Sequence, residues 1–546
     1  MRRPPLRYGA LLGGVTTLAL VALFFLGEQF AGLPFVPFDL FDWLARVLPG
    51  DVITLGIDGI VRTINALNLG PTSDAAKFLE QLMGIGLVLG IGTLAGLFIA
   101  WLLQRTTRQG WRVGATVGVA LFFLSLLVVS SVGFSGDPTL SILWMAVLFV
   151  GWGGLLGSWL DAEPVAHPIA TGEARATRRA MLTRVVGGSF AVALASWGFG
   201  RVFGSQASES GASQPLASVL EATPQPPASG AEVAPLPQAT LEPTAPAVDR
   251  RTPPPAPGTR PELTSNDDFY RIDINARPVV INQQEWEFVA DGLFETPRTF
   301  TLAELMAYPA VTQTVTMGCI SNRVGGDLIG TSNWTGLSLR DLLEELGISP
   351  VAQVLYMESA DGFYESIARE DFMDERAMLV YGMNGETLPV EHGFPLRIYI
   401  PNRYGMKQPK WITRMEAVPE WQPGYWVERG WSREARPQIV SVIDTIAVDN
   451  AEDGVVPVGG IAWAGDRGIW QVEVQVDDGD WEPAALRTPP LSALTWVQWR
   501  YDWPATPGRH TLRVRATDGT STLQTSREQG VRPDGATGYH SRTVTI

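Results

Sequence analysis

The chain of 546 residues has one cysteine and four histidines. A single cysteine forms no intrachain disulfide, and structural zinc sites usually draw on several cysteine and histidine ligands. The cysteine, Cys319, is therefore either an inert buried side chain or a thiolate that reacts or binds a metal. Its neighbours alone, from Met317 to Arg323, leave both roles open.

Basic residues are also fewer than acidic ones. The chain has 41 lysines and arginines and 56 aspartates and glutamates, which gives a formal net charge of −15. A nucleic-acid partner would require a basic face, so the composition argues against one. No C-x-x-C-H sequence, iron–sulfur cysteine set or dinucleotide fingerprint is present. An enzyme built on this chain would therefore exchange electrons with a separate partner, such as a cytochrome or a quinone-linked subunit.

Long apolar runs dominate the first part of the chain. Five runs have the length and polarity of membrane helices, and the fifth is shorter and richer in small residues. They cover residues 9–26, 82–103, 113–134, 140–160 and 185–203. We expect residues 1–203 to form an α-helical bundle that anchors the chain in the lipid bilayer. Residues 33–69 are expected to form one or two amphipathic surface helices and not a span.

Arginines cluster before the first run, between the second and third runs, and before the fifth, whereas the other loops are acidic or short. The positive-inside rule then places the N-terminus in the cytoplasm. With five spans, everything that follows lies on the outer face of the cell membrane. The pair Arg178-Arg179 also resembles a twin-arginine export signal, which the sequence does not separate from an ordinary cluster of positive charge on the inner side.

The remainder of the chain divides into three parts. Residues 204–262 are rich in Pro, Ala, Ser and Thr and predict a disordered tether. Residues 263–436 predict an α+β domain, with a capping box at Thr301 and Glu304, a helix capped by Ser338, and a strand over 311–317 that ends just before Cys319. Residues 437–546 predict an all-β domain whose short strands and polar turns favour an immunoglobulin-like sandwich.

Several ordered motifs lie in these two domains. They are Gly318-Cys319-Ile320-Ser321-Asn322-Arg323, Trp334-Thr335-Gly336, Met383-Asn384-Gly385, His392-Gly393-Phe394-Pro395-Leu396-Arg397, and Lys410-Trp411. Together with the β-strand patterns near Trp470 and Arg513, this series resembles the sulfite oxidase superfamily of molybdopterin enzymes over residues 269–546. Ordered motifs over such a length are far more specific than one short pattern.

The resemblance implies a molybdenum–molybdopterin cofactor. Cys319 is then the metal ligand, Asn322 and Arg323 shape its loop, and Arg323 favours the thiolate. Tyr364 is the loosely matched active-site tyrosine. The residues expected to bind the cofactor and its phosphate are Arg271, Asn322, His392, Arg397, Lys407 and Lys410. The resemblance also implies that residues 437–546 are the family's dimerisation domain, and hence a homodimer.

Two departures from the family pattern concern the substrate. Ser321 stands where sulfite oxidases have glycine, and Val324 stands where they have a second arginine that helps to hold the sulfite anion. An apolar side chain there weakens the electrostatic clamp and favours a neutral or larger substrate. We expect a membrane-anchored molybdopterin oxidoreductase that performs oxygen-atom or two-electron transfer on a small molecule. The alternative is a cofactor-free binding or sensory domain that kept the fold.

Overall fold

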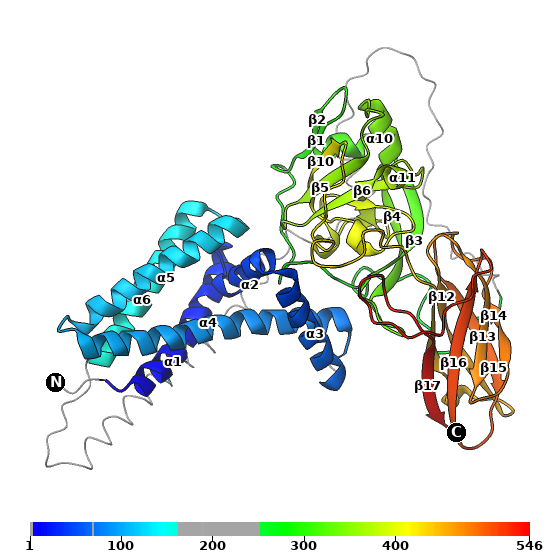
Figure 1. The fold of residues 1–546 in the computed structure, drawn as a ribbon, viewed down its shortest axis with the longest axis horizontal. Helices are drawn as coiled ribbons and strands as arrows, with labels where there is room; N and C mark the ends of the chain where they lie inside the picture. Colours follow the sequence, from blue (N-terminus) through cyan, green and yellow to red (C-terminus); the bar gives the residue numbers. More distant parts are fainter. Residues whose placement is uncertain (1–3, 68–69, 162–186, 188, 190–251) are drawn as a thin grey trace. The chain divides into compact units, whose positions relative to one another are not determined.

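The computed structural model describes residues 4–67, 70–161, 187, 189 and 252–546, which fall into two units (Figure 1). The helical unit contains, among the described residues, 4–67, 70, 74–161, 187, 189 and 273–278. The β-rich unit contains residues 71–73, 252–272 and 279–546.

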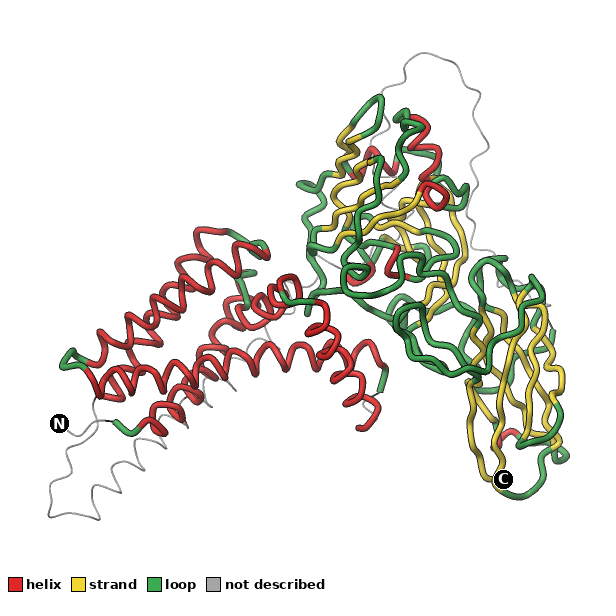
Figure 2. The backbone as a smooth tube through the Cα atoms, in the orientation of Figure 1, coloured by secondary structure: helices red, strands yellow, loops and turns green. Residues whose placement is uncertain are grey.

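The helical unit is all-α in its described part (Figure 2). Helices α1, α4, α5 and α6 are long and apolar enough to cross a membrane, and they match four of the five predicted spans. The fifth predicted span, residues 185–203, lies outside the described residues except for 187 and 189. The bounds are α1 Leu6–Ala31, α2 Val36–Val47, α3 Gly50–Leu67, α4 Thr72–Arg105, α5 Gly110–Val132 and α6 Pro138–Asp161. Helices α2 and α3 thus occupy the stretch that the sequence assigns to surface helices.

Glycines bring the apolar helices into close contact. A β-carbon at Gly114 of α5 would overlap the carbonyl oxygen of Gly153 in α6, and one at Gly157 would overlap the carbonyl oxygen of Gly110. Gly13 of α1 likewise lies against α4. Small residues at four-residue spacing let helix backbones approach in a lipid environment, where apolar side chains alone give little drive for association. The helix pairs therefore pack in the way that membrane helices do.

A short stretch from later in the chain completes the helical unit. The segment Asp273–Pro278, here called the inserted segment, belongs to this unit. The Nζ of Lys77 donates to the carbonyl oxygens of Asp273 at 2.8 Å and of Asn275 at 3.0 Å. The Asp42 carboxylate accepts the N–H of Ala276 at 2.7 Å. Charged groups of α2 and α4 thus satisfy the main chain of the inserted segment.

Two small sheets form the first part of the β-rich unit. The first has the order β2-β1-β10-β5-β6, and only the β1–β10 pair is parallel. The second has the order β3-β4-β7-β8, with β9 also paired to β7. Their bounds are β1 Phe288–Gly292, β2 Arg298–Phe300, β3 Val311–Gly318, β4 Ile329–Ser338, β5 Val354–Ser359, β6 Tyr364–Ala368, β7 Met378–Met383, β8 Glu386–Thr387, β9 Arg397–Tyr399 and β10 Ile412–Val418.

The helices of this part begin where the sequence predicts. Thr301 and Glu304 form the expected capping box of α9 (Leu302–Met306), and the Ser338 hydroxyl accepts the N–H of Asp341 to cap α10 (Leu339–Glu345). Each cap satisfies N–H groups that have no partner inside the helix. Leucines on one face of α10 then enter a core with Phe288, Met357 and their neighbours. The remaining helical turns are α11 Arg369–Phe372, η3 Val390–His392 and η4 Gly405–Lys407.

The C-terminal part is one continuous sheet. Its strand order is β11-β12-β15-β14-β13-β16-β17. The immunoglobulin-like sandwich expected from the sequence is not confirmed, because β14 pairs with both β13 and β15 and so joins all strands in one path. The end strands approach each other, since the Ile443 N–H donates to His540 Nδ1 at 3.0 Å. The bounds are β11 Val440–Ile446, β12 Val455–Trp463, β13 Ile469–Val476, β14 Trp481–Leu486, β15 Val497–Pro504, β16 Arg509–Asp518 and β17 His540–Thr545.

Residues 252–262 lie against this C-terminal sheet, although the sequence places them at the end of the tether. Arg260 forms an ion pair with Asp444 at 2.6 Å, and Glu262 pairs with Arg487 at 3.2 Å. The indole N–H of Trp496 donates to the carbonyl oxygen of Glu262 at 3.2 Å. Ordered structure therefore begins before residue 263.

Candidate cofactor site

Cys319 directly follows β3 and begins the loop of residues 319–328, here called the cysteine loop. The loop is closed at its base, because the Cys319 N–H donates to the carbonyl oxygen of Leu328 at 2.9 Å. In its middle, the Asn322 N–H donates to the carbonyl oxygen of Cys319 at 3.0 Å, and the Asn322 Oδ1 accepts the N–H of Leu328 at 3.0 Å. Asn322 therefore braces the loop.

The Cys319 side chain is buried among hydrogen-bond donors. Burial raises the pKa of its thiol, and the Ser321 hydroxyl, the N–H groups of Ser321 and Ile320, and the charge of Lys410 oppose this rise. The Ser321 Oγ lies 3.0 Å from the Cys319 Sγ. The cation with the largest effect on the thiol is thus Lys410, whereas Arg323, to which the sequence assigned this role, is exposed.

Arg397 is a buried cation without a carboxylate partner among the described residues. Its Nη1 donates to the carbonyl oxygen of His392 at 3.1 Å, its Nη2 lies 3.7 Å from the Met317 Sδ, and its guanidinium carbon lies 4.7 Å from the centre of a Trp334 ring. Burial lowers the pKa of Arg397 to about 10. A buried charge of this kind is costly unless an anion accompanies it.

His392 lies in the same cationic surroundings. Its Nε2 is 3.0 Å from the carbonyl oxygen of Asn266, an acceptor, so this nitrogen carries the hydrogen. Burial first, and then the positive charges of Lys410, Arg397 and Arg271, lower the pKa of His392 to about 3. The structure thus brings together four of the residues that the sequence assigned to phosphate binding.

Gly393 allows these groups to converge. Its φ is +114°, a conformation that favours glycine. A β-carbon there would lie 3.0 Å from the Cβ of Lys410 and 3.2 Å from that of Arg397. The absence of a side chain lets the main chain pass close to both cations.

The residues present fit the cofactor that the sequence implies. The buried Nε atoms of Arg397 and Trp334 (Nε1 in the indole) have no hydrogen-bond partner among the described residues. Unpaired buried donors beside uncompensated positive charge are what an anionic phosphate would satisfy. The donors around the Cys319 sulfur suit a ligating thiolate, which has no proton of its own to donate.

Two further predicted site residues are engaged elsewhere. The Lys407 Nζ pairs with the Glu365 Oε1 at 2.7 Å, and both side chains are buried. The Tyr364 hydroxyl donates to the Glu428 carboxylate. Lys407 is thus already neutralised by a carboxylate, unlike Arg397, and Tyr364 belongs to a cluster with Tyr356 and Tyr425.

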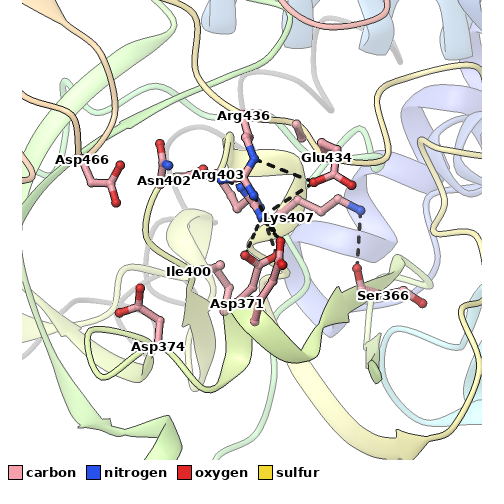
Figure 3. Close-up of polar contacts among 12 residues, drawn as sticks. Ser366, Asp371, Asp374, Ile400, Asn402, Arg403, Lys407, Glu434, Arg436 and Asp466 are labelled. Atoms are coloured by element: carbon pink, nitrogen blue, oxygen red, sulfur yellow. Dashed lines mark hydrogen bonds and ion pairs between the residues drawn. The ribbon is translucent and has the colours of Figure 1, made fainter. Parts of the chain in front are cut away.

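Ion pairs fix the chain that leads to Lys407 (Figure 3). Arg403, almost completely buried, contacts the Asp371 carboxylate at 2.6 Å, and its Nη2 lies 3.9 Å from the Glu434 carboxylate. Arg436 lies 3.8 Å from the same Glu434 carboxylate. These ion pairs therefore hold the segment just before the turn η4, which begins two residues after Arg403.

The sequence reasoning missed two tyrosines near the cysteine. Burial and the neighbouring Cys319 raise the pKa of Tyr270, and its hydroxyl would lie 3.0 Å from a β-carbon at Gly405. Burial raises the pKa of Tyr404 to about 12, and Cys319 adds to the effect. The sequence held one signal for Tyr270. The aromatic pair Phe269-Tyr270 directly precedes Arg271, which was already assigned to phosphate binding.

The C-terminal sheet also contacts the cysteine loop and the end of β3. A β-carbon at Gly318 would lie 3.1 Å from the Trp463 ring, and Gly325 lies directly against the His540 ring. Ile320 shares a buried cluster with Trp463 and Trp431. The surroundings of Cys319 are therefore built from both parts of the β-rich unit, which no local pattern could reveal.

Comparison with known proteins gives matches in this same region. Residues 275–426 match the family model described as the oxidoreductase molybdopterin binding domain. The chain is similar to sulfite oxidase of Arabidopsis thaliana, with 27% identity over 281 residues, 42% of this chain and 71% of that protein. It is also similar to the putative protein-methionine-sulfoxide reductase subunit YedZ1 of Azospira oryzae, with 28% identity over 152 residues, 28% of this chain and 56% of that one.

Among solved structures, the sulfane dehydrogenase SoxCD of Paracoccus pantotrophus is similar at 22% identity and a TM-score of 0.47. This match covers 61% of this chain and 97% of that one.

Proposed function

The chain belongs, through residues 275–426, to the sulfite oxidase superfamily of molybdopterin-dependent oxidoreductases, and we propose that it uses a molybdenum cofactor for oxygen-atom or two-electron transfer on a small substrate. The observation that carries the cofactor assignment is Arg397, a buried guanidinium without a carboxylate partner among the described residues. It lies beside His392 and 3.7 Å from Met317, two residues before Cys319. Phosphate binding and metal ligation would thus take place close together.

The chemistry of each residue suggests whether it would bind the metal or the phosphate. The Cys319 thiolate would bind molybdenum, and the N–H groups of Ile320 and Ser321 would stabilise its charge. The phosphate would take hydrogen bonds and charge from the cationic group, which consists of Arg271, His392, Arg397 and Lys410. When bound, the cofactor supplies an oxo-molybdenum centre that exchanges an oxygen atom or two electrons with the substrate. The protein positions that centre and sets the electric field around it.

Metal and pterin analysis of the purified full chain tests the assignment. We expect stoichiometric molybdenum and pterin in the wild type made in a host that synthesises the cofactor. Cys319→Ser should lose the metal while keeping its fold, judged by circular dichroism and heat unfolding. The matched control is Ser338→Ala, which removes a hydroxyl from the same domain but leaves Cys319 untouched. A wild type without molybdenum and pterin would overturn the proposal.

For localisation, we propose a multi-pass membrane anchor with the catalytic domain on the outer face of the cytoplasmic membrane. The four apolar helices and the arginine-rich loops support it. The side of the membrane on which the catalytic domain lies depends on whether residues 185–203 form a fifth span. Four spans return the chain to the side of its N-terminus, and five do not. Alkaline phosphatase fused after Ile546 should be active, because this reporter matures only outside the cytoplasm. An inactive fusion combined with a fluorescent green fluorescent protein fusion would place the domain inside.

We also propose that electrons reach the site from a separate carrier, a cytochrome or a quinone-linked subunit. The sequence holds no iron–sulfur cysteine set and no C-x-x-C-H haem motif, and the Azospira relative is named as a subunit. The purified chain should therefore show no Soret absorption. It should turn over sulfite, sulfoxides or N-oxides only when an artificial electron carrier is added.

A further inference from the structure

The two residues that follow Cys319 place hydrogen-bond donors near its sulfur. The Ser321 Oγ is 3.0 Å from the Sγ, and the main-chain N–H groups of Ile320 and Ser321 lie near enough to lower the pKa of the thiol. The two N–H groups belong to the backbone and would be present with almost any sequence. The hydroxyl is the one donor of the three that depends on which side chain occupies position 321.

The cysteine loop holds this hydroxyl in place. The Asn322 N–H and the Leu328 carbonyl both bond to main-chain atoms of Cys319, at 3.0 Å and 2.9 Å. Ser321, between Cys319 and Asn322, is therefore held on both sides, and its side chain is partly buried. A short side chain on a fixed backbone loses little entropy when it makes a hydrogen bond.

Metal ligation decides the direction of this hydrogen bond. In the free thiol either atom can donate, but a ligating thiolate has no proton, so the Ser321 hydroxyl must donate to the sulfur. A donor withdraws electron density from a thiolate and weakens its donation to the metal. The reduced centre, which carries more electron density, then gains more than the oxidised centre.

We propose that Ser321 is a positioning residue that orients the Cys319 sulfur toward the metal and raises the reduction potential of the molybdenum centre. The inference rests on the proposed function. It assigns a consequence to Ser321, one of the two positions at which this chain departs from the sulfite oxidase pattern that its sequence resembles. A higher potential makes the centre a stronger oxidant of its substrate and a weaker reductant of its electron partner.

A redox titration followed by the paramagnetic molybdenum signal tests the inference on the full chain in detergent. Ser321→Ala should retain molybdenum, and its midpoint potential should move to a more negative value. For a one-electron couple, a shift of about 59 mV in the midpoint potential corresponds to a change of about tenfold in the ratio of oxidised to reduced centre at a fixed potential. Ser321→Thr keeps the hydroxyl and should stay near the wild type. Ser338→Ala, which loses a helix cap elsewhere in the domain, should not shift the potential.

The outcomes separate this inference from the function on which it rests. Molybdenum-loaded Ser321→Ala with an unchanged midpoint overturns the inference alone. A wild type without molybdenum overturns the proposed function and the inference with it. If Ser321→Ala fails to fold or to bind metal, Ser321→Gly is the second variant. Loss of metal in both variants but not in Ser321→Thr supports the orienting role, whereas equal loss in Ser321→Thr contradicts it.

Discussion

The Nζ of Lys407 lies 2.7 Å from the Oε1 of Glu365, and both side chains are almost completely buried. Lys407 ends the turn η4, whose first residue, Gly405, packs against the Tyr270 hydroxyl and the carbonyl oxygen of Gly318. The ion pair therefore anchors the turn that lies beside Cys319. This assigns Lys407 a contact that the sequence did not indicate, because its partner is 42 residues away.

Breaking this pair from one side should destabilise the protein strongly. Glu365→Gln leaves the Lys407 charge buried and unpaired, which typically costs about 3–5 kcal/mol. The double variant Glu365→Leu with Lys407→Met removes both charges and should cost clearly less. The measurement is the midpoint of denaturant unfolding, followed by tryptophan fluorescence. A double variant that loses as much stability as Glu365→Leu and Lys407→Met lose together as single variants would contradict this account.

Replacing Arg397 should affect the apo and the loaded protein in opposite ways. Arg397→Met removes a buried, uncompensated cation, so the apo variant should be more stable than apo wild type by about 1 kcal/mol or more. The same change should abolish or weaken cofactor binding. Heat unfolding of protein from a cofactor-deficient host gives the first result, and molybdenum analysis gives the second. Arg340→Met, on the exposed face of α10, is the control and should change neither.

His392 should make the apo protein sensitive to acid. Its pKa in the fold is about 3, below the ordinary value of about 6.5 in the unfolded chain. Between these values the unfolded state binds more protons, so stability falls as the pH falls, by up to about 1.4 kcal/mol per pH unit. Heat-unfolding midpoints between about pH 7.5 and about pH 5 should drop more steeply for wild type than for His392→Gln. Parallel pH profiles would show that His392 is not the cause.

Gly325 should tolerate no side chain. Its φ is +77°, and a β-carbon would overlap the His540 imidazole. Gly325→Ala therefore combines a strained backbone with overpacking, and we expect a loss of about 2 kcal/mol or more. Adding His540→Ala should restore the part due to overpacking but not the part due to the backbone. Unfolding midpoints of the two single variants and the double variant measure this. No recovery in the double variant would assign the whole loss to the backbone.

Val324 should limit the use of sulfite. The wild type is expected to oxidise sulfite with a low kcat/KM, because one cation of the anion clamp is missing. Val324→Arg should raise this value, by up to about 10² if the added charge reaches the transition state. Val324→Leu is the control for bulk. Steady-state kinetics with an artificial electron acceptor would contradict the prediction if wild type were already efficient and the arginine brought no gain.

The sequence predicted what depends on neighbours along the chain. The helix caps at Thr301 and Ser338, the strand that ends before Cys319, and the apolar helices all follow from side chains a few residues apart. The cationic group, to which we propose that the phosphate binds, takes His392 and Arg397 from one short motif, and Lys410 follows soon after in the sequence.

What the sequence did not predict depends on contacts between distant residues. The single path of the C-terminal sheet follows from the pairing of β14 on both edges, and hydrophobic alternation does not specify which strands pair. Tyr270 and His540 approach the cysteine loop from segments 49 and 221 residues away from Cys319. Ser321 was noticed as a departure from glycine, but its hydrogen bond to the sulfur required the structure.

The inserted segment has a consequence for biosynthesis. Lys77 finds its acceptor at Asp273, 196 residues further along the chain, and the Asp42 carboxylate finds its donor at Ala276, 234 residues away. A ribosome that has made α1 to α6 has not yet made these partners. Until synthesis passes residue 278, Lys77 can pair with Glu80 in its own helix, but the main-chain acceptors and the N–H of the inserted segment are still missing. Completion of the helical unit thus waits for residues 273–278.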